Sequence, residues 1–334
     1  MPELAALRSR ILLCSTLLPL LLALPGRGLL AQGFSPQTTE GQIERSRLPN
    51  PVLPVAPGAL SLGEPPEASD STAEPRAPVA PGDSDLGVQS LLRAYERPKP
   101  WSLFADGGFV YTTNVALTRR NTQDDFFFVG EGGASYEWTL SPALSISAAA
   151  REQYFAYDRF DQLDFGALNV AVAVAYTAHR LDDVVLSAQL GFTRLTRRGL
   201  ADHEFYRNGG LALGAQKVFT LGRAQLFSLG GDIDLGLSLP HAAEREEFGL
   251  SAGYIVQITR HLSAQTGGRV AYYLYAATGR EDFNASGTAG LTYAFTPWCS
   301  LGATVSGTVD RSSRAVFDYQ VLNSGASAFF RLRF

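Results

Sequence analysis

The sequence contains few cysteines and few histidines. It contains two cysteines, Cys14 and Cys299, and four histidines among 334 residues. Cys14 lies in the apolar N-terminal stretch, so removal of that stretch would leave one thiol and no internal disulfide. The formal net charge is −4 and no basic stripe stands out. This charge distribution gives no electrostatic reason to expect nucleic acid as a partner.

Sequence motifs that carry chemistry are also missing. We find no metal-ligand spacing, no phosphate-binding loop and no nucleophile elbow around a serine. His179 and His261 fall in short predicted turns, where a polar turn residue is the simple interpretation. The sequence therefore predicts no catalytic residue, no metal site and no cofactor, and we do not expect an enzyme.

The one long apolar run lies at the N-terminus. Arg8 and Arg10 precede an almost wholly apolar run over 11–24, and residues 29–31 offer a small residue for cleavage. Prolines interrupt this stretch, which falls short of the roughly 20 apolar residues that a spanning helix needs. We predict a cleaved secretory signal peptide over 1–31, and a single membrane anchor is the alternative.

Proline is scarce after Trp101 but abundant before it. Of the 18 prolines only Pro142, Pro240 and Pro297 follow Trp101, whereas residues 32–100 contain many prolines and few aromatic residues. A segment of this composition cannot bury enough apolar area to fold. We therefore predict a disordered, partly polyproline periplasmic leader over 32–100.

From Trp101 to Phe334 apolar and polar residues alternate over long runs. In one run Leu235 and Leu237 face one way, whereas Asp232 and Asp234 face the other. The pattern predicts about twelve strands, an even number as closed bacterial barrels require. The strands are expected near residues 101–112, 126–140, 143–156, 165–178, 184–196, 205–219, 224–238, 248–259, 262–276, 283–296, 299–310 and 320–334.

The predicted connections alternate strictly between short turns and longer charged loops. The short turns are expected at 141–142, 179–183, 220–223, 260–261 and 297–298. The longer loops are expected around 119–125, 158–164, 197–204, 240–247, 280–282 and 310–318. The first predicted strand starts, and the last one ends, on the side of the short turns. This pattern is typical of periplasmic turns, extracellular loops and a periplasmic leader.

A soluble β-sandwich would alternate in the same way, so strand length and the position of aromatic residues decide. The predicted strands run to about twelve residues, which span a tilted path across a bilayer core, whereas ordinary strands average about five or six. Aromatic residues such as Trp138 and Tyr154 gather at the strand ends. Ionisable residues on the apolar face lie near the strand ends, where their charges can reach water, and are Glu152, Arg194, Arg207 and Lys217. We therefore predict an all-β fold, a transmembrane antiparallel up-and-down β-barrel over 101–334.

The C-terminal residues carry a family resemblance. The stretch Ser327–Phe334 reads SAFFRLRF and resembles the signal by which the barrel assembly machinery recognises outer-membrane proteins. The three residues of this assembly signal share one face and are Phe330, Leu332 and Phe334. The start of the barrel, from Ala105 through Thr113-Asn114-Val115 to Tyr136-Glu137-Trp138, is similar to the outer-membrane β-barrel porins. The resemblance covers 101–334 and implies a bacterial outer-membrane location, in contact with membrane lipids and lipopolysaccharide.

The inward face predicted from the alternation is small and polar. A barrel of about twelve strands lies between the eight strands that side chains fill and the sixteen that leave a channel, so we expect a narrow aqueous path. We predict a porin-like passive channel for small solutes or ions. The alternative is a lumen closed by charge pairs, in which Asp232, Asp234, Glu131 and Glu137 meet Arg151, Arg269, Arg331 and Arg333. The predicted pore-lining residues are Arg151, Gln189, Asp232, Asp234, Gln265, Arg269, Arg331 and Arg333.

Two other classes of function stay open. An adhesive barrel would use charged loops such as 194–204 and 244–247 to meet surface polysaccharide, lipopolysaccharide or a partner. An outer-membrane hydrolase would use an acid and histidine pair in the outer loops, where charges more often form a solvated rim. The candidate pairs are His203 beside Asp202 and Glu204, and His241 ahead of Glu244. No pattern in the sequence encodes the identity of the solute or the oligomeric state.

Overall fold

The computed structural model describes residues 36–48, 100–198 and 203–334, which belong to one compact unit. The predicted signal peptide over 1–31 lies outside the described residues, as does most of the predicted leader over 32–100. Both remain predictions for those residues.

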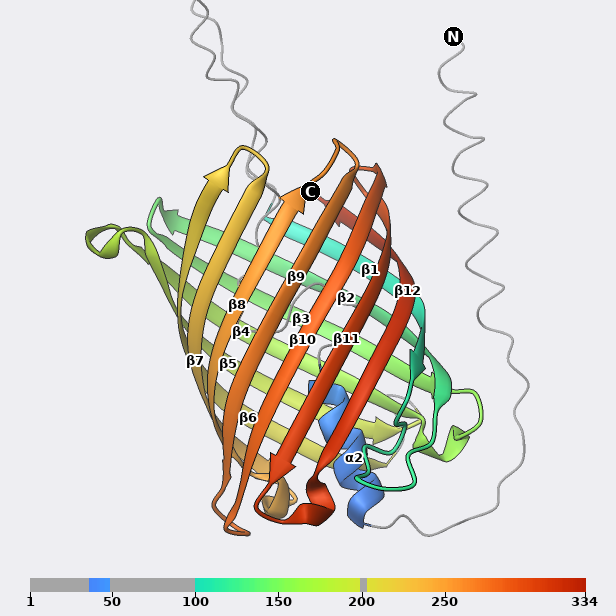
Figure 1. Cartoon of the computed structure of the whole chain (residues 1–334). Helices are drawn as coiled ribbons and strands as arrows, with labels where there is room; N and C mark the ends of the chain where they lie inside the picture. The colour runs from blue at the N-terminus through green and yellow to red at the C-terminus, as the bar shows by residue number, and fades with distance from the viewer. Residues whose placement is uncertain (1–35, 49–99, 199–202) are drawn as a thin grey trace, which may run out of the picture. The chain divides into compact units, whose positions relative to one another are not determined.

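Twelve antiparallel strands form one closed sheet (Figure 1). Each strand pairs with its neighbours in the chain, and β1 pairs with β12 to close the barrel. The strands are β1 (Trp101–Thr112), β2 (Asp125–Ser141), β3 (Leu144–Tyr157), β4 (Phe165–Ala178), β5 (Val184–Arg197), β6 (Glu204–Gly222), β7 (Gln225–Leu239), β8 (Glu246–Gln257), β9 (Leu262–Tyr275), β10 (Arg280–Thr296), β11 (Cys299–Ser312) and β12 (Tyr319–Arg333). The predicted up-and-down barrel of twelve strands is confirmed, with bounds that shift by a few residues.

The two faces of the sheet differ as the alternation predicts. Outward side chains include Leu190, Leu237 and Leu250, which are 66%, 74% and 65% exposed. Exposed apolar surface on this scale is unfavourable in water, at about 25 cal/mol per Å². The outward face therefore fits the hydrocarbon of a bilayer, where a closed sheet also pairs every backbone group.

The two ends of the barrel carry different connections. The end that we call the loop end receives the connections after odd-numbered strands, and lies at the bottom of Figure 1. Three short 3₁₀ helices lie in these connections: η3 (Asp161–Leu163), η5 (His241–Ala243) and η6 (Ala315–Phe317). The opposite end, the turn end, has the connections after even-numbered strands, and one of them contains η4 (His179–Leu181). The start of β1 and the end of β12 also lie at the turn end.

The predicted alternation of short turns and long loops is wrong at one loop. Residues 280–282 lie in β10 and pair with Tyr275, Leu274 and Tyr273 of β9, so the connection is confined to 276–279. Charged residues suggested a loop here, but Arg280 and Asp282 face the lumen, where they form an ion pair of 3.0 Å. Ion pairing inside the lumen allows charged residues to continue a strand.

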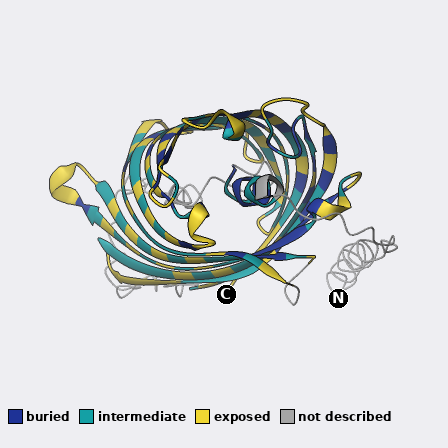
Figure 2. Ribbon diagram, turned by 90° about the horizontal axis from the view of Figure 1, so that it is seen from below, coloured by how far each residue is buried: buried dark blue, intermediate teal, exposed yellow. Residues whose placement is uncertain are grey.

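A helix inside the barrel corrects the predicted leader. Helix α2 (Pro36–Arg47) lies within the ring of strands near the loop end (Figures 1 and 2). The prediction that 32–100 cannot fold is therefore wrong for residues 36–47. Proline is well tolerated in the first turn of a helix, and the helix buries its side chains against the barrel and does not need a core of its own. No helix in the described part of the chain is long and apolar enough to cross a membrane.

Barrel closure predicts a specific disulfide. Tyr111 of β1 and Ser324 of β12 are register partners, so cysteines introduced at both positions lie about 5 Å apart at Cα and can form a disulfide. In a Cys299→Ser background we expect Tyr111→Cys with Ser324→Cys to cross-link upon mild oxidation, measured by mass spectrometry. The matched control combines Tyr111→Cys with Val305→Cys, because Val305 is the β11 partner of Ser324 and lies two strands away, about 9–10 Å. A cross-link in the control but not in the pair would contradict the closure.

Candidate functional site

The loop end of the lumen has two chemically different walls. The wall formed by β1 to β6 is mainly apolar and aromatic, and Ile43 of α2 packs into it. We call it the apolar wall, and its barrel residues include Val110, Phe127, Phe155, Phe165, Leu195 and Tyr206. The wall formed by the end of the connection before β8, by the start of β8, by β9 and by β10 is charged. We call it the charged wall, and its residues are Arg245, Glu247, Arg269, Arg280 and Asp282. Helix α2 lies between them.

Arg45 of α2 is the most deeply embedded cation of the helix. Its guanidinium donates to Thr112 Oγ1 at 3.2 Å and to Asn323 Oδ1 at 3.1 Å, and to the carbonyl oxygens of Asn114 at 2.7 Å and Val115 at 3.2 Å. We call these four acceptors the oxygen cage. The guanidinium also lies 5.5 Å from the centre of the Phe127 ring. Among the described residues no carboxylate forms an ion pair with Arg45, so neutral oxygens and a ring solvate its charge.

The oxygen cage is fixed by a separate set of hydrogen bonds. Asn114 is fully buried, and its side-chain amide donates to the carbonyls of Thr118 at 2.8 Å and Gln320 at 2.9 Å. Its Oδ1 accepts from the backbone N–H of Thr118 at 3.0 Å. These bonds tie the connection after β1 to β12. The carbonyls that face Arg45 are therefore positioned by the barrel as well as by the helix.

Two carboxylates of α2 face the charged wall. Glu44 Oε1 lies 2.9 Å from Arg245 Nη1, and Glu40 Oε1 lies 2.8 Å from Arg280 Nη2. Tyr275 donates its hydroxyl to Glu44 at 3.5 Å. Glu40 and Glu44 are one helical turn apart and so share a face of α2. We call Arg245 and Arg280 the arginine pair.

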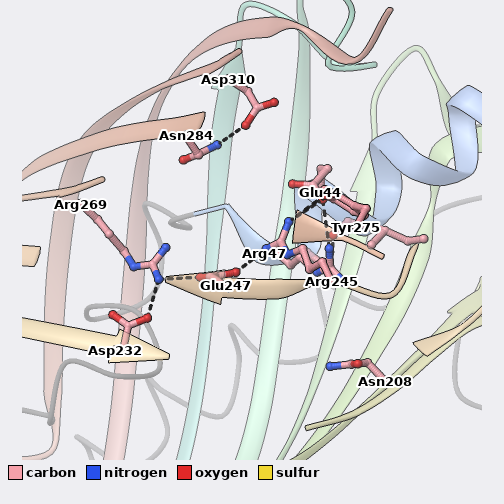
Figure 3. A network of polar contacts seen from close by, with 12 residues as sticks. Glu44, Arg47, Asn208, Asp232, Arg245, Glu247, Arg269, Tyr275, Asn284 and Asp310 are labelled. Carbon is pink, nitrogen blue, oxygen red and sulfur yellow. Dashed lines mark hydrogen bonds and ion pairs between the residues drawn. The ribbon is translucent and has the colours of Figure 1, made fainter. Parts of the chain in front are cut away.

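The charged wall continues away from α2 as a chain of ion pairs (Figure 3). Arg245 contacts Glu247 at 2.8 Å, Glu247 contacts Arg269 at 2.5 Å, and Arg269 contacts Asp232 at 2.6 Å. Gly249 makes the last contact possible, because a Cβ there would meet the Arg269 guanidinium at 2.2 Å and the Asp232 carboxylate at 2.7 Å. Alternating charges along the wall thus neutralise one another.

A glycine allows α2 to approach the barrel. Gly41 lies in the middle of the helix, where glycine costs roughly 0.5–1 kcal/mol relative to alanine. A Cβ at this position would lie 2.8 Å from the backbone oxygen of Ala116, a distance that real Cβ atoms do not show. Next to it Gln42 donates its side-chain amide to the carbonyl of Leu163 at 3.0 Å. Gly41 therefore lowers the helix propensity of α2 but allows the helix to lie against the barrel backbone.

Burial and charge act in opposite directions on Glu44. Burial alone would raise the pKa of the Glu44 carboxyl, but Arg245, Arg47 and Arg280 outweigh it and hold the pKa below its ordinary value of 4.5. Glu44 is therefore ionised when α2 is docked at neutral pH. Ion pairing contributes to docking above the ordinary pKa, and this contribution is lost as the pH falls.

The eight predicted pore-lining residues all alternate onto the inward face of the sheet. The register places Asp232 opposite Gly214 and Gly249, and Arg269 opposite Ser251 and Ser286. Asp232 and Arg269 form a direct ion pair of 2.6 Å, which is one of the charge pairs of the closed-lumen alternative. The other six, placed at separate inward positions, are Arg151, Gln189, Asp234, Gln265, Arg331 and Arg333. Their role in a pore stays a prediction.

The sequence reasoning missed the residues that bind α2. The missed residues are Glu40, Gly41, Glu44, Arg45, Arg245, Arg280, Asn323 and Tyr275. One signal for the helix is present in the sequence, because Ser35-Pro36 is a typical helix start and Glu40 and Glu44 follow at helical spacing. The partners of α2 carry no such local signal.

Two basic residues on the outward face form ion pairs with acidic residues near the ends of the strands. Lys217 Nζ is 3.4 Å from Asp182 in the connection after β4, and Arg194 Nε is 2.9 Å from Glu204 at the start of β6. These contacts are consistent with side chains that extend toward the ends of the barrel. Phe330, Leu332 and Phe334 are exposed, and their role as an assembly signal stays a prediction.

Two histidines pair with carboxylates in exposed connections of the barrel. His241 Nδ1 lies 3.2 Å from Glu244 in an exposed loop, and His179 Nδ1 lies 2.6 Å from Asp183 in a turn. Asp202, the predicted neighbour of His203, lies outside the described residues. In the described ranges no group of three or more His, Cys, Asp or Glu residues could hold a metal ion.

Comparison with known proteins finds similarity in fold. No protein-family model and no curated protein matches the chain. An outer membrane channel from Pseudomonas putida F1 is 13% identical over 75% of this chain and 100% of its own, with a TM-score of 0.49. The translocator domain of the autotransporter NalP from Neisseria meningitidis is 10% identical over 71% and 90%, with a TM-score of 0.40. The outer membrane channel DcaP of Acinetobacter baumannii is 10% identical over 70% and 96%, with a TM-score of 0.38. The barrel fold of this chain is shown by its own strand pairing.

The close approach at Gly41 predicts the effect of a side chain there. Gly41→Leu should make α2 a better helix in isolation, yet displace it from the barrel, because the new side chain meets the Ala116 backbone. We expect amide hydrogen exchange in residues 36–48 to become about tenfold faster or more, measured by mass spectrometry. Thr39→Ala in the same helix raises the helix propensity without filling the contact and should leave exchange slow. Unchanged protection in Gly41→Leu would show that the approach is not required.

The pKa of Glu44 predicts acid release of α2. A spin label on Thr39→Cys, in a Cys299→Ser background, should be immobile at neutral pH and become mobile as the pH falls below the ordinary Glu44 value of 4.5. The sign follows from the depressed pKa, since docking is favoured only while the carboxyl is ionised. With Glu44→Gln the label should already be more mobile at neutral pH and respond less to acid. Release on raising the pH would contradict this assignment.

Proposed function

We propose that this protein is a porin-like passive channel of the bacterial outer membrane, and that α2 closes its lumen at the loop end. The observation that carries the proposal is a closed barrel with an apolar exterior and a polar lumen, inside which α2 is bound by ion pairs and hydrogen bonds. In this proposal the chain is not an enzyme, and the assembly signal at Phe330, Leu332 and Phe334 directs it to the barrel assembly machinery. Its outward face contacts membrane lipids and lipopolysaccharide.

The chemistry of the α2 interface supports reversible closure. Ile43 and Leu48 are the apolar residues of this segment buried at the barrel, and each contributes roughly 1.5–3 kcal/mol at most when fully buried. The remaining contacts are polar, and buried ion pairs add little net stability because desolvation offsets the attraction. Polar interfaces of this kind resemble transient contacts between proteins more than a permanent core. Release of α2 therefore costs less than unfolding of the barrel.

The lumen that α2 vacates is suited to small polar solutes. Inward glycines such as Gly210, Gly230 and Gly249 leave room for the polar side chains of neighbouring inward residues. The Arg269 and Asp232 pair and the inward Arg151, Arg331 and Arg333 place charges of both signs along the path. Charges of both signs allow polar solutes to replace their hydration shell as they pass.

Planar-bilayer recordings of the full chain test the proposal. We expect small or intermittent ion currents from the wild type and a severalfold larger steady conductance when α2 is released by Glu44→Gln with Arg45→Gln, or by Gly41→Leu. Thr39→Ala serves as the control and should behave as the wild type. Silence in every variant would overturn the channel, whereas equal steady conductance in all would overturn closure by α2.

A further inference from the structure

Helix α2 occupies two adjacent binding subsites of opposite character. One is the arginine pair with the Tyr275 hydroxyl, which binds the carboxylates of Glu44 and Glu40. The other is the oxygen cage, which binds the guanidinium of Arg45. Because Glu44 and Arg45 are consecutive residues, one short stretch of peptide fills both subsites. The following inference rests on the proposed function, since it concerns the site after α2 has left.

The carboxylate subsite is built into the barrel. The side chains of Arg245 and Arg280 are 8% and 4% exposed. Arg245 lies 3.8 Å from the Tyr273 ring centre, and Arg280 lies between Tyr275 at 3.6 Å and Phe317 at 4.0 Å. Stacking on aromatic rings fixes the guanidinium planes independently of α2. These rings, together with Glu247 and Asp282, belong to the barrel, so the contacts that hold both arginines do not depend on α2.

The charged wall discriminates against a simple anion. Arg245 already contacts Glu247, and Arg280 already contacts Asp282. Asp310, which accepts a hydrogen bond from Asn284 at 2.9 Å, adds a further carboxyl nearby. These carboxylates repel an anion that brings no cation with it. A carboxylate ligand therefore gains when it also carries a positive group.

The oxygen cage discriminates in the opposite direction. Its four atoms act as acceptors toward Arg45, and Phe127 presents the face of a ring, so the cage favours a group with several N–H donors. A guanidinium satisfies four acceptors with its planar fork of donors, better than a compact ammonium. A carboxylate has no donor to offer when ionised. The two subsites therefore cannot exchange their ligands.

We propose that the vacated site binds short peptides in which a carboxylate side chain is adjacent to a guanidinium side chain, and that such peptides compete with α2. In this model α2 is a tethered copy of the ligand. Peptides of this class would enter the lumen at the loop end and be the solutes that the channel recognises. Free anions and free cations fill one subsite only and bind more weakly.

Three blocked dipeptides separate the subsites. Acetyl-Glu-Arg-amide carries both groups, acetyl-Gln-Arg-amide lacks the carboxylate, and acetyl-Glu-Gln-amide lacks the guanidinium. We expect calorimetry of full-length Gly41→Leu in detergent to show binding of the first about tenfold tighter or more than either of the others. The wild type should bind the first dipeptide more weakly than Gly41→Leu, because α2 competes. Equal binding of all three dipeptides, or no binding of any, would overturn the proposal.

Variants of the two subsites supply the matched controls. Arg245→Gln should weaken the two peptides that contain glutamate and leave acetyl-Gln-Arg-amide unchanged. Asn323→Leu should weaken the two that contain arginine and leave acetyl-Glu-Gln-amide unchanged. If Arg245→Gln fails to fold, Tyr275→Phe removes a single donor to Glu44 and should give the same selectivity to a smaller degree. Uniform loss for all three peptides in both variants would contradict two separate subsites.

The failure of this inference is distinguishable from the failure of the proposed function. Calorimetry does not require ion current, and the recordings do not require a peptide. Steady current from Gly41→Leu without peptide binding would leave the channel standing and remove the proposed solute class. Peptide binding without current from any variant would leave the site standing and remove the channel.

Discussion

The pairing of β1 with β12 is the contact on which the rest of the structure depends. In hydrocarbon an unpaired backbone N–H or C=O costs several kcal/mol, so an open sheet edge is excluded and the last strand must return to the first. Closure fixes the alternation of every strand at once, so that one set of side chains faces the bilayer and the other set lines the lumen. The lumen, its charges and the space for α2 all follow from it.

A closed lumen also creates the conditions under which α2 can be bound. Small inward residues prevent the side chains of twelve strands from filling the interior, and the two walls differ because β1 to β6 and β8 to β10 contribute different residue types at the loop end. Helix α2 matches both walls, because Ile43 packs against the apolar wall and the carboxylates of the helix pair with the charged wall. Gly41 lowers the helix propensity of α2, but the missing side chain allows the barrel backbone to lie against the helix.

The barrel was largely predictable, whereas the site was not. A strand in a bilayer must alternate with period two, and this local rule predicted the strand bounds to within a few residues, including the inward position of Asp232 and Arg269. Arg280 and Asp282 were misassigned to a loop because their ion pair inside the lumen is not visible in the sequence. Helix α2 was not predicted because the proline-rich composition of residues 32–100 outweighs the single local signal of a helix start at Ser35-Pro36.

The sequence by itself determined the class of fold, the number of strands and the face on which each side chain lies, because these depend on periodicity between near neighbours. Only the tertiary structure decided that Arg45 meets Asn323, and that Glu44 meets Arg245 and Tyr275, residues about 200 or more positions away. Such partners are selected by the stagger of neighbouring strands and the depth of α2 in the lumen. No local pattern specifies either quantity, since both arise when the sheet closes around the helix.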